Sequence, residues 1–426
     1  MIQGQKEQKG QGGQRDHCRP PSSIVLHRLL LPAALLAAVW GCSGEASAGA
    51  EYTVRDSIGI EIVENVSGSW TDDTRWRLSS DPVVDIGVLE GAPEYQLFQV
   101  RDPRRLPDGR FVVGNANELR FYDADGTYLF TSGQQGSGPG EFEGLGILRP
   151  FPGDSLLAYD FQLTRASVFD ANGEFGRSYQ VIPPTEGGFG FAVGAFSDGT
   201  LIIKSPQIFQ GGFEEGAQRR DEDHYTISST GEFLDSAGTF PGPEQFIETA
   251  RDGDNFMVSV TSPPFGRTTV LEVHGTQFCF GSSDTYEIRC FRQDGTLTRI
   301  VRRAVSNRTV TADDLESLKR QELADADDEN SRRATERRFE EMPVAETMPA
   351  YDGLAIDAAG NLWVREYAFI DGLERRWTVF DTSGRMLGDV TFPANFGVTQ
   401  IGEDFVLGVW RDDLEVEHVR LYELIK

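Results

Sequence analysis

The sequence predicts an all-β fold made of repeated small sheets, and three observations support this prediction. The 426 residues contain 47 glycines and 20 prolines, which suits short strands joined by turns better than long helices. A unit of turn, strand, variable tip and second strand recurs along the chain. Its two clearest copies begin at Leu106 and Phe151, and both place an aromatic–Asp pair just before a second turn glycine, at Tyr122–Asp123 and Phe169–Asp170.

The number of copies follows from the first turn glycine of each, and these are Gly109, Gly153, Gly199, Gly275, Gly360 and Gly402. Their spacings are 44, 46, 76, 85 and 42 residues. A four-stranded propeller blade takes about 40 to 50 residues, so each long spacing holds a blade plus an insertion. The sequence therefore predicts a six-bladed β-propeller over residues 74–426.

The last copy, which begins at Ile401, has room for only three strands before Lys426. Because a propeller has to protect its terminal edge strand, we expect the missing strand to come from the N-terminal part of the chain. The segment PVVDIGVLEGAPEY from Pro82 parallels YLFTSGQQGSGPGEF from Tyr128 in the first copy. We predict that this N-terminal segment supplies the outer strand of the sixth blade, after a tether and an extra strand in residues 42–73.

The glycine-rich stretch GQQGSGPGEF, residues 133–142, has two interpretations: a phosphate-binding loop, or a joint between two sheets. A phosphate-binding loop ends in Lys followed by Ser or Thr and leads into a helix, and this stretch supplies neither. We therefore expect a joint between the outer strand of one blade and the inner strand of the next. Glycine permits the tight path there, and Pro139 stiffens it.

Two insertions interrupt the repeats. Residues 206–223 contain GGFEEGAQRRDED and predict an exposed loop. Residues 309–342 carry leucines among many charges, with Thr311 as a plausible N-cap and Asp313 and Asp314 in the first turn. They predict a helical insertion of one or two helices between the fourth and fifth blades, which either covers one mouth of the propeller or extends into solvent.

The N-terminal apolar run LLLPAALLAAVW, residues 29–40, is too short to span a membrane but suits the core of a signal peptide. The segment VWGCSG is similar to the lipobox of bacterial lipoproteins, although Trp40 departs from the small residue usual at its position. We expect a signal peptide at residues 1–41 and a lipid anchor on Cys42. This places the protein in the bacterial cell envelope, periplasmic or at the outer membrane; an ordinary cleavage near Ala48 is the alternative.

The charge balance excludes one class of partner. Without residues 1–41 the chain keeps 35 basic and 65 acidic side chains, a formal charge of −30. Such a surface repels nucleic acid and anionic lipid headgroups, so we expect no nucleic-acid partner and membrane contact through the lipid anchor alone. A solvated acidic surface is sufficient to explain the remaining charge.

A family resemblance supports the fold. GSGPGEF from Gly136, followed by GDSLLAYDFQLTRASVFDANGEF from Gly153, resembles the NHL-type repeat. Over the mature chain the sequence resembles bacterial six-bladed β-propeller lipoproteins, and VRDSIGIEIVEN from Val54 is similar to their N-terminal segment. The resemblance implies the propeller fold and leaves the function open, because propellers support many unrelated activities.

The sequence contains no recognisable catalytic motif. His224, His274 and His418 remain after processing, and none has the spacing of a metal site or a catalytic triad. The acidic run ADADDEN from Ala324 lacks the glycine and the terminal glutamate of a calcium loop and is better explained as a solvated charge run.

Cys279 and Cys290 flank a turn centred on Asp284 and Thr285, which places the two cysteines directly opposite each other on neighbouring strands. In an oxidising envelope this favours a cross-strand disulfide, and two reduced core cysteines are the alternative.

Ligands of propellers usually bind at the central funnel, which the innermost strands line. The polar residues predicted at the starts of these strands are Arg101, Asp102, Glu143, Arg267, Tyr351, Asp352 and Asn395. Lactonase-type propellers hold a divalent cation there with acidic and amide side chains, which would make Glu143, Asp352 and Asn395 its ligands. Turn closure or pairing with neighbours is the alternative, and we predict no cofactor.

We expect a non-enzymatic propeller, anchored in the envelope, that presents its funnel and loops to a protein or a small ligand. The alternative is a metal-dependent hydrolase or lyase of the lactonase or NHL-lyase type, in which a funnel carboxylate acts as the base.

Overall fold

A computed structural model describes residues 51–184, 189–206, 214–252, 255–326, 328–370 and 372–426. The predicted signal peptide and Cys42 lie outside these residues. Strands dominate the described chain, and its two α-helices are α1 (Ala312–Ala324) and α2 (Glu329–Glu341). Neither helix is long and apolar enough to cross a membrane. The predicted all-β class is confirmed.

Six of the seven sheets in the described chain each contain at least three consecutive antiparallel strands of the repeat, and we number these six in chain order. Sheet one contains β5 (Val100–Arg105), β6 (Phe111–Asn115), β7 (Glu118–Tyr122) and β8 (Tyr128–Ser132). Sheet two contains β9 (Leu145–Phe151), β10 (Ser155–Asp160), β11 (Arg165–Phe169) and β12 (Phe175–Gln180). Sheet three contains β13 (Phe191–Ala195), β14 (Leu201–Pro206), β16 (Asp221–Ile227) and β17 (Phe233–Pro241).

The other three sheets repeat this order. Sheet four contains β20 (Val270–His274), β21 (Gln277–Gly281), β22 (Glu287–Arg292) and β23 (Leu297–Arg303). Sheet five contains β24 (Tyr351–Ile356), β25 (Leu362–Glu366), β26 (Arg375–Phe380) and β27 (Met386–Phe392). Sheet six contains β28 (Phe396–Ile401), β29 (Phe405–Arg411) and β30 (Glu417–Ile425), completed by β3 (Arg77–Leu78) and β4 (Val84–Ile86).

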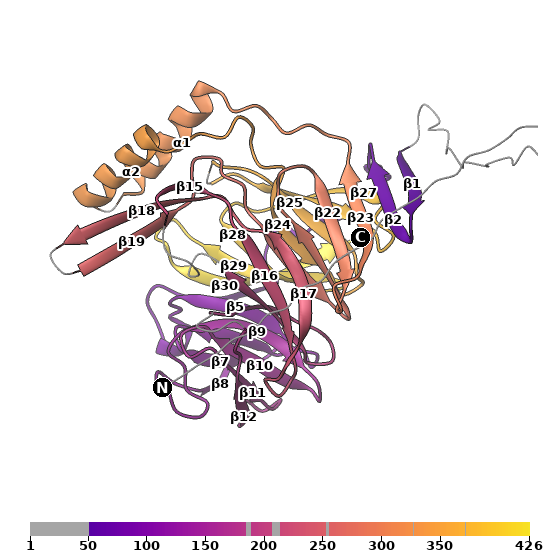
Figure 1. The fold of residues 1–426 in the computed structure, drawn as a ribbon. Helices are drawn as coiled ribbons and strands as arrows, with labels where there is room; N and C mark the ends of the chain where they lie inside the picture. The colour runs from indigo at the N-terminus through magenta and orange to yellow at the C-terminus, as the bar shows by residue number, and fades with distance from the viewer. Residues whose placement is uncertain (1–50, 185–188, 207–213, 253–254, 327, 371) are drawn as a thin grey trace, which may run out of the picture. The chain divides into compact units, whose positions relative to one another are not determined.

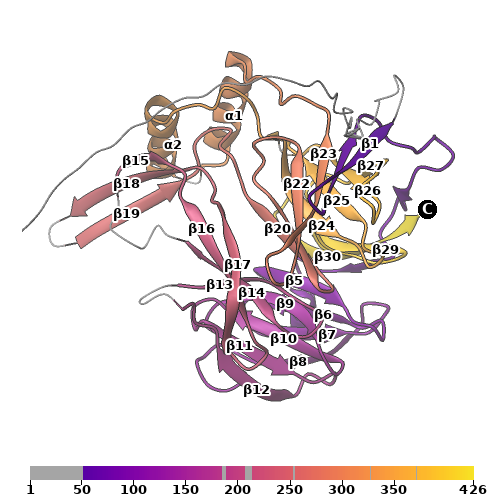
Figure 2. The same ribbon diagram turned by 45° about the vertical axis from the view of Figure 1, so that its right-hand side comes forward.

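The first strands of the six sheets contact one another in sequence (Figures 1 and 2). β5 contacts β9, β9 contacts β13, and β13 contacts β20. The series continues from β20 to β24 and β28, and β28 contacts β5 again. The first strands therefore form a ring of contacts, and the arrangement is propeller-like.

The glycine-rich stretch 133–142 lies between β8, the last strand of sheet one, and β9, the first strand of sheet two. The Glu141 carboxylate accepts hydrogen bonds within this turn, from the Gly138 N–H at 2.8 Å and from Gln134 Nε2 at 2.7 Å. Gly136 has a φ of +151°, a backbone conformation that residues with a side chain rarely adopt, which favours glycine there. The stretch is the expected joint between two sheets.

The N-terminal residues 52–86 contact sheets four, five and six in turn, and we call them the N-terminal strap. The hairpin of β1 (Tyr52–Ser57) and β2 (Ile60–Asn65) joins sheet four, where β2 pairs in parallel with β23. The Trp70 N–H donates to the Leu387 carbonyl of β27 in sheet five. β3 and β4 pair with β30 in sheet six. The segment expected to supply the outer strand of sheet six is thus β4, and the extra strand expected in residues 42–73 is a hairpin on sheet four.

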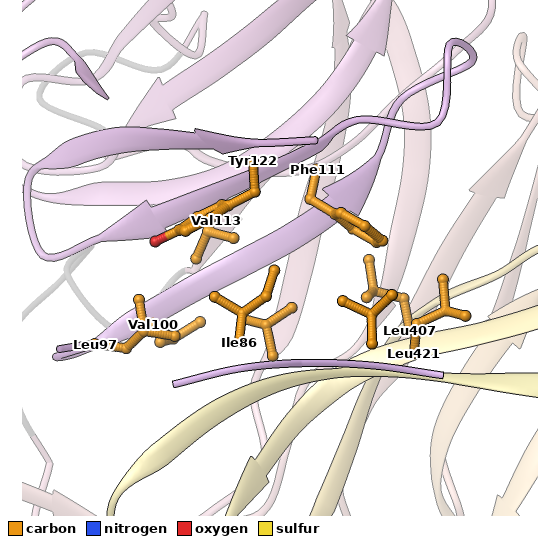
Figure 3. Packing of buried hydrophobic residues seen from close by; sticks show 10 residues of the cluster. Ile86, Leu97, Val100, Phe111, Val113, Tyr122, Leu407 and Leu421 are labelled. Atoms are coloured by element: carbon orange, nitrogen blue, oxygen red, sulfur yellow. The ribbon is translucent and has the colours of Figure 1, made fainter. Parts of the chain in front are cut away.

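A hydrophobic cluster fills the interface between sheets one and six (Figure 3). Ile86 from β4 and Leu407 and Leu421 from β29 and β30 are buried on one side. Phe111, Val113 and Tyr122 from sheet one face them. The strap therefore contributes apolar side chains to the contact between the first and last sheets, in addition to its backbone pairing.

The prediction of an exposed loop for residues 206–223 is wrong for part of that range. β15 (Gly216–Gln218) pairs with β18 (Gln245–Asp252), which pairs with β19 (Asn255–Thr261). This small sheet forms because β18 and β19, an insertion after sheet three, offer an edge to β15. Such a partner is distant in sequence, and local composition does not reveal it.

The helical segment contains α1 and α2, which lie alongside β18 and β19 in both views (Figures 1 and 2). Arg337 of α2 is 3.7 Å from the Glu248 carboxylate of β18. Thr311 is the N-cap of α1, since its hydroxyl accepts from the Asp314 N–H and the Asp314 carboxylate accepts from the Thr311 N–H. The expected N-cap is confirmed.

Adjacent valines of the strap test whether its packing matters to the fold. Val84 is 8% exposed and lies in the cluster between sheets one and six, whereas Val83 is 64% exposed. Val84→Ala should lower the free energy of unfolding by about 2 kcal/mol, because it removes two buried methyl groups and leaves a cavity. Val83→Ala, the control, should change it by less than about 0.5 kcal/mol in urea denaturation. Equal effects of the two substitutions would contradict this role of the strap.

Candidate functional site

The first strands that form the ring carry β-bulges opposite their second strands. Among the described sheets, the pairing register shifts in this way in sheets one, two, three, five and six. A bulge adds one unpaired residue and changes the direction of its side chain. Asp102, Asp352 and Thr399 lie at these register shifts in sheets one, five and six.

The larger cavity at the ring, which we call the mouth cavity, has a volume of about 1040 Å³. Its wall comes from β5, β28 and β29 and from residues 324–326 at the end of α1. The helical insertion thus contributes to the mouth. The charged residues that line the cavity are Asp102, Asp325, Arg365, Arg375, Arg411, Glu415 and Glu417.

Several of these charges are held in pairs. Arg411 Nη2 donates to Glu417 Oε1 at 2.9 Å, and Glu417 Oε2 accepts from the Val100 N–H at 2.7 Å. Arg365 Nε donates to Asp352 Oδ1 at 2.5 Å. Burial raises the pKa of Asp352, and Arg365 acts against this rise. The mouth cavity therefore presents oriented polar groups whose charges are largely balanced.

A second cavity, which we call the channel cavity, has a volume of about 450 Å³ and adjoins the first, since Arg365 and Val398 line both. Aliphatic residues of five first strands form much of its wall: Ile147, Val193, Leu271, Leu354 and Val398. Polar and aromatic residues of the second and third strands complete it: Lys204, Glu222, His224, Phe280, Arg365 and Trp377.

Lys204 and Arg365 occupy equivalent positions in sheets three and five. Each lies five residues after its turn glycine, Gly199 or Gly360, on the second strand of its sheet. Lys204 pairs in register with His224, and Arg365 pairs with Trp377. The register of the two sheets therefore brings two cationic side chains, each with a ring beside it, to one cavity.

His224 is buried beside this cavity and is uncharged at neutral pH. Its Nδ1 lies 3.1 Å from the Glu222 carbonyl oxygen, and its ring meets the edge of Phe240. Burial lowers the pKa of His224 to about 4. Because His224 is uncharged, Lys204 is the cationic group in this part of the cavity, and its Nζ is 3.5 Å from Glu222 Oε2.

A cluster of charged side chains ties the first strands together. Asp102 accepts from Arg104 Nη2 at 2.6 Å, from the Leu148 N–H at 2.8 Å, and from Arg149 Nη1. Burial lowers the pKa of Arg104, and the positive charge of Arg149 adds to this effect. Burial raises the pKa of Glu272, which interacts with both arginines. These groups connect β5, β9 and β20 electrostatically.

Four of the seven predicted funnel residues lie at or directly behind the cavities. Asp102 and Asn395 line the mouth cavity. Arg101 lines a recess of about 290 Å³ next to it, which shares Arg411 and Glu417 with the mouth cavity. Asp352 supports Arg365 without lining either cavity itself.

The structure places the other three elsewhere, since they line neither the mouth cavity nor the channel cavity. Tyr351 is fully buried between sheets four and five, and its hydroxyl donates to the Glu287 carbonyl at 2.8 Å. The β-bulge that follows Tyr351 gives the inward-facing position to the next residue, Asp352. Arg267 donates to the carbonyl and hydroxyl oxygens of Thr347 at 2.9 and 2.6 Å. Glu143 precedes β9, in the turn where its N–H donates to Asp160 Oδ2 at 2.7 Å.

The two cysteines lie directly opposite each other on β21 and β22 and form a disulfide, with an S–S distance of 2.03 Å. Both contribute to a cavity of about 560 Å³ on the side of the interface between sheets four and five. This cavity shares no residue with the mouth and channel cavities.

Among the described side chains, no three or more His, Cys, Asp or Glu residues are grouped so that they could hold a metal ion. The three candidate ligands are also separated. Asp352 is bonded to Arg365, Asn395 lines the mouth cavity, and Glu143 lines neither cavity. In the described part of the chain, these three residues are therefore not grouped as ligands of one cation.

Sequence reasoning missed Lys204, Arg365 and Trp377. Its search covered the starts of the innermost strands, whereas these side chains come from second and third strands. A signal was present: the second strands GTLIIKS and GNLWVRE carry a basic residue at the position where the first copy, GRFVVGN, has Gly114. A charge in an otherwise apolar strand could have identified both cationic residues.

Comparisons with known proteins find likeness in structure alone. No family model and no curated protein matches the chain. A protein of Bacteroides fragilis described as exported is 12% identical, with a TM-score of 0.46 over 85% of this chain and 99% of that one. A gluconolactonase of Xanthomonas campestris is 12% identical, with a TM-score of 0.38 over 76% and 87% of the two chains. The calcium-binding protein regucalcin of Agrobacterium tumefaciens is 12% identical, with a TM-score of 0.36 over 82% and 95%.

Two Asp–Arg pairs in sheet one test the importance of the charged cluster. Asp102 and Arg104 are 15% and 12% exposed, whereas the Asp108–Arg110 pair is 50% and 21% exposed. Asp102→Asn should lower the free energy of unfolding by about 3 kcal/mol, because the two largely buried arginines Arg104 and Arg149 lose their counter-charge. Asp108→Asn should cost less than about 1 kcal/mol. The measurement is urea denaturation at pH 7, and a cost at Asp102 no larger than at Asp108 would contradict the central role of the cluster.

The buried His224 predicts a loss of stability in weak acid. Its pKa is about 4 in the folded chain and 6.5 in an ordinary environment, so the unfolded chain binds more protons between these values. The free energy of unfolding should therefore decrease as the pH falls from 6.5 to 4, by up to about 3 kcal/mol from this residue. His224→Leu should show a shallower decrease, and the exposed control His274→Leu should keep the slope of the wild type. Identical slopes for His224→Leu and wild type would refute the assignment.

Proposed function

We propose that this protein is a six-bladed β-propeller, closed by β4, that is anchored in the bacterial cell envelope through a lipid on Cys42 and binds a small ligand. In this proposal sheets one to six are the blades, and the ligand enters through the mouth cavity into the channel cavity. The ring of contacts between the first strands and the pairing of β4 with β30 support the six-bladed closure. The lipobox-like segment VWGCSG supports the anchor.

The observation that carries the binding function is the pair of adjoining cavities. Ligand sites are usually concave and largely apolar, with a few polar groups that converge on the ligand. The channel cavity has an aliphatic wall and converging side chains at Lys204, Arg365 and Trp377. The mouth cavity adds paired charges and a wall segment from α1. Together they offer a ligand two adjoining spaces with different linings.

Binding is favoured over hydrolysis by the surroundings of the two funnel aspartates. A general base has to lie within reach of the proton that it removes. Asp102 accepts from three donors, and Asp352, whose Oδ1 accepts from Arg365 Nε, lines neither cavity. One observation favours the enzyme alternative: burial raises the pKa of Asp352, which would make it a better proton acceptor if Arg365 moved away.

Thermal-shift measurements with a substitution that narrows the channel test this proposal. The protein starting at Ser43 is screened against small carboxylic acids, sugars, peptides and calcium chloride. A compound that binds, present at a free concentration of about a hundred times its Kd, should raise the free energy of unfolding of the wild type by about 2.7 kcal/mol. Val398→Trp, at the junction of the two cavities, should abolish this gain, and Val305→Trp, an exposed control, should retain it.

Two results would contradict the proposal. The first is a stabilising compound whose effect is the same in Val398→Trp and in the wild type, because its site would then lie elsewhere. The second is one tightly held calcium ion per chain that is lost in Asp352→Asn, which would favour the metal-dependent enzyme.

A further inference from the structure

The channel cavity has positive charge at two separate places. Lys204 approaches it from sheet three and Arg365 from sheet five, at equivalent positions of the two sheets. Sheet four lies between them in the ring, because β20 contacts both β13 and β24. A ligand that reaches both cations therefore has to cross the part of the wall that sheet four supplies.

The wall between the two cations carries apolar side chains. Sheet four contributes Val270, Leu271 and Phe280 to the cavity, preceded by the polar Thr269, and Val193 and Leu354 lie on the neighbouring first strands. Hydrocarbon gains free energy on leaving water for such a surface, and a charged group in contact with it would lose hydration without compensation. The middle of the cavity thus suits methylene groups, and its two ends suit anions.

Each cation is supported by an acid in a different way. Arg365 Nε donates to the Asp352 carboxylate, and Arg365 Nη2 donates to the Asp352 backbone carbonyl. Asp352 does not itself line the cavity. The guanidinium has further N–H donors beyond these two. Lys204 is 3.5 Å from the Glu222 carboxylate, which does line the cavity. His224 adds no charge at neutral pH. The residues that line the channel cavity thus include two cations and one carboxylate, in a protein whose overall charge is −27.

We propose that the ligand of the channel cavity is a small dicarboxylate whose two anionic groups are separated by an apolar body, one group meeting Lys204 and the other Arg365. This inference rests on the proposed binding function and specifies the chemical class of the ligand. A guanidinium can bind a carboxylate through two parallel hydrogen bonds, and a lysine binds it as a point charge.

Isothermal titration with unbranched dicarboxylates, from succinate to suberate, tests the class. One chain length should bind best, because the two cations are fixed by their strands. The monocarboxylate of that length should bind at least tenfold more weakly, and the diamine of that length should not bind. A monocarboxylate or diamine that binds as tightly as the best dicarboxylate would overturn the proposal, and so would an affinity that does not depend on chain length.

Three substitutions test the two residues. Lys204→Gln and Arg365→Gln remove the charge and keep a hydrogen-bond donor for Glu222 or Asp352, which favours retention of the fold. Each should weaken the best dicarboxylate at least tenfold, and Lys204→Arg should restore most of the affinity lost in Lys204→Gln. Arg376→Gln, an exposed arginine on the neighbouring strand β26, is the control and should leave the affinity unchanged. Equal affinity of the wild type and either charge-removing variant would overturn the proposal.

The outcome separates this inference from the proposed function. If no dicarboxylate binds, but another compound stabilises the wild type and not Val398→Trp, the ligand class is wrong and the binding function stands. If no compound distinguishes the wild type from Val398→Trp, both are wrong.

Discussion

The contact between the first and last sheets is the constraint on which the rest of the structure depends. β4 pairs with β30, and its side chains join the hydrophobic cluster between sheets one and six. Side-chain contacts hold the same seam at the inner strands, where Thr399 Oγ1 donates to the Pro103 carbonyl at 3.0 Å and Arg104 Nη1 donates to the Thr399 carbonyl. Because β5 and β28 both line the mouth cavity, that cavity exists only while the seam is intact.

Charge at the centre of the ring serves two purposes. In the cluster around Asp102, the acid and its arginines satisfy one another and connect neighbouring first strands, so their charges support the ring. At the channel cavity, Lys204 and Arg365 face a space with apolar walls, and their acidic partners lie to one side or behind. Both regions therefore contain acids and cations, and they differ in whether the acids lie between the cations or beside and behind them.

Much of the fold could be predicted from the sequence, and much less of the site. The spacing of the turn glycines predicted repeated small sheets, and the segment from Pro82, which resembles the one from Tyr128, contains β4, which pairs with β30. The site depends on registers and bulges, which shift side chains by one position without a local signal. Tyr351 was thus expected at the funnel and lies in the core, while Arg365, on the next strand, reaches the cavity. β15 pairs with β18, which is distant from it in sequence, and no pattern in the sequence predicted this pairing.

The N-terminal strap also determines when the fold can be completed. Its strands are among the first parts of the described chain to be synthesised, yet their partners are β23, β27 and β30, and β30 ends one residue before Lys426. Pairings between segments so distant in sequence close large loops and form slowly. Until β30 emerges, β4 has no sheet to join and the apolar faces of sheets one and six stay uncovered. A nascent chain therefore carries β3 and β4 unpaired until β30 has been made, and unpaired strand edges favour aggregation during that time.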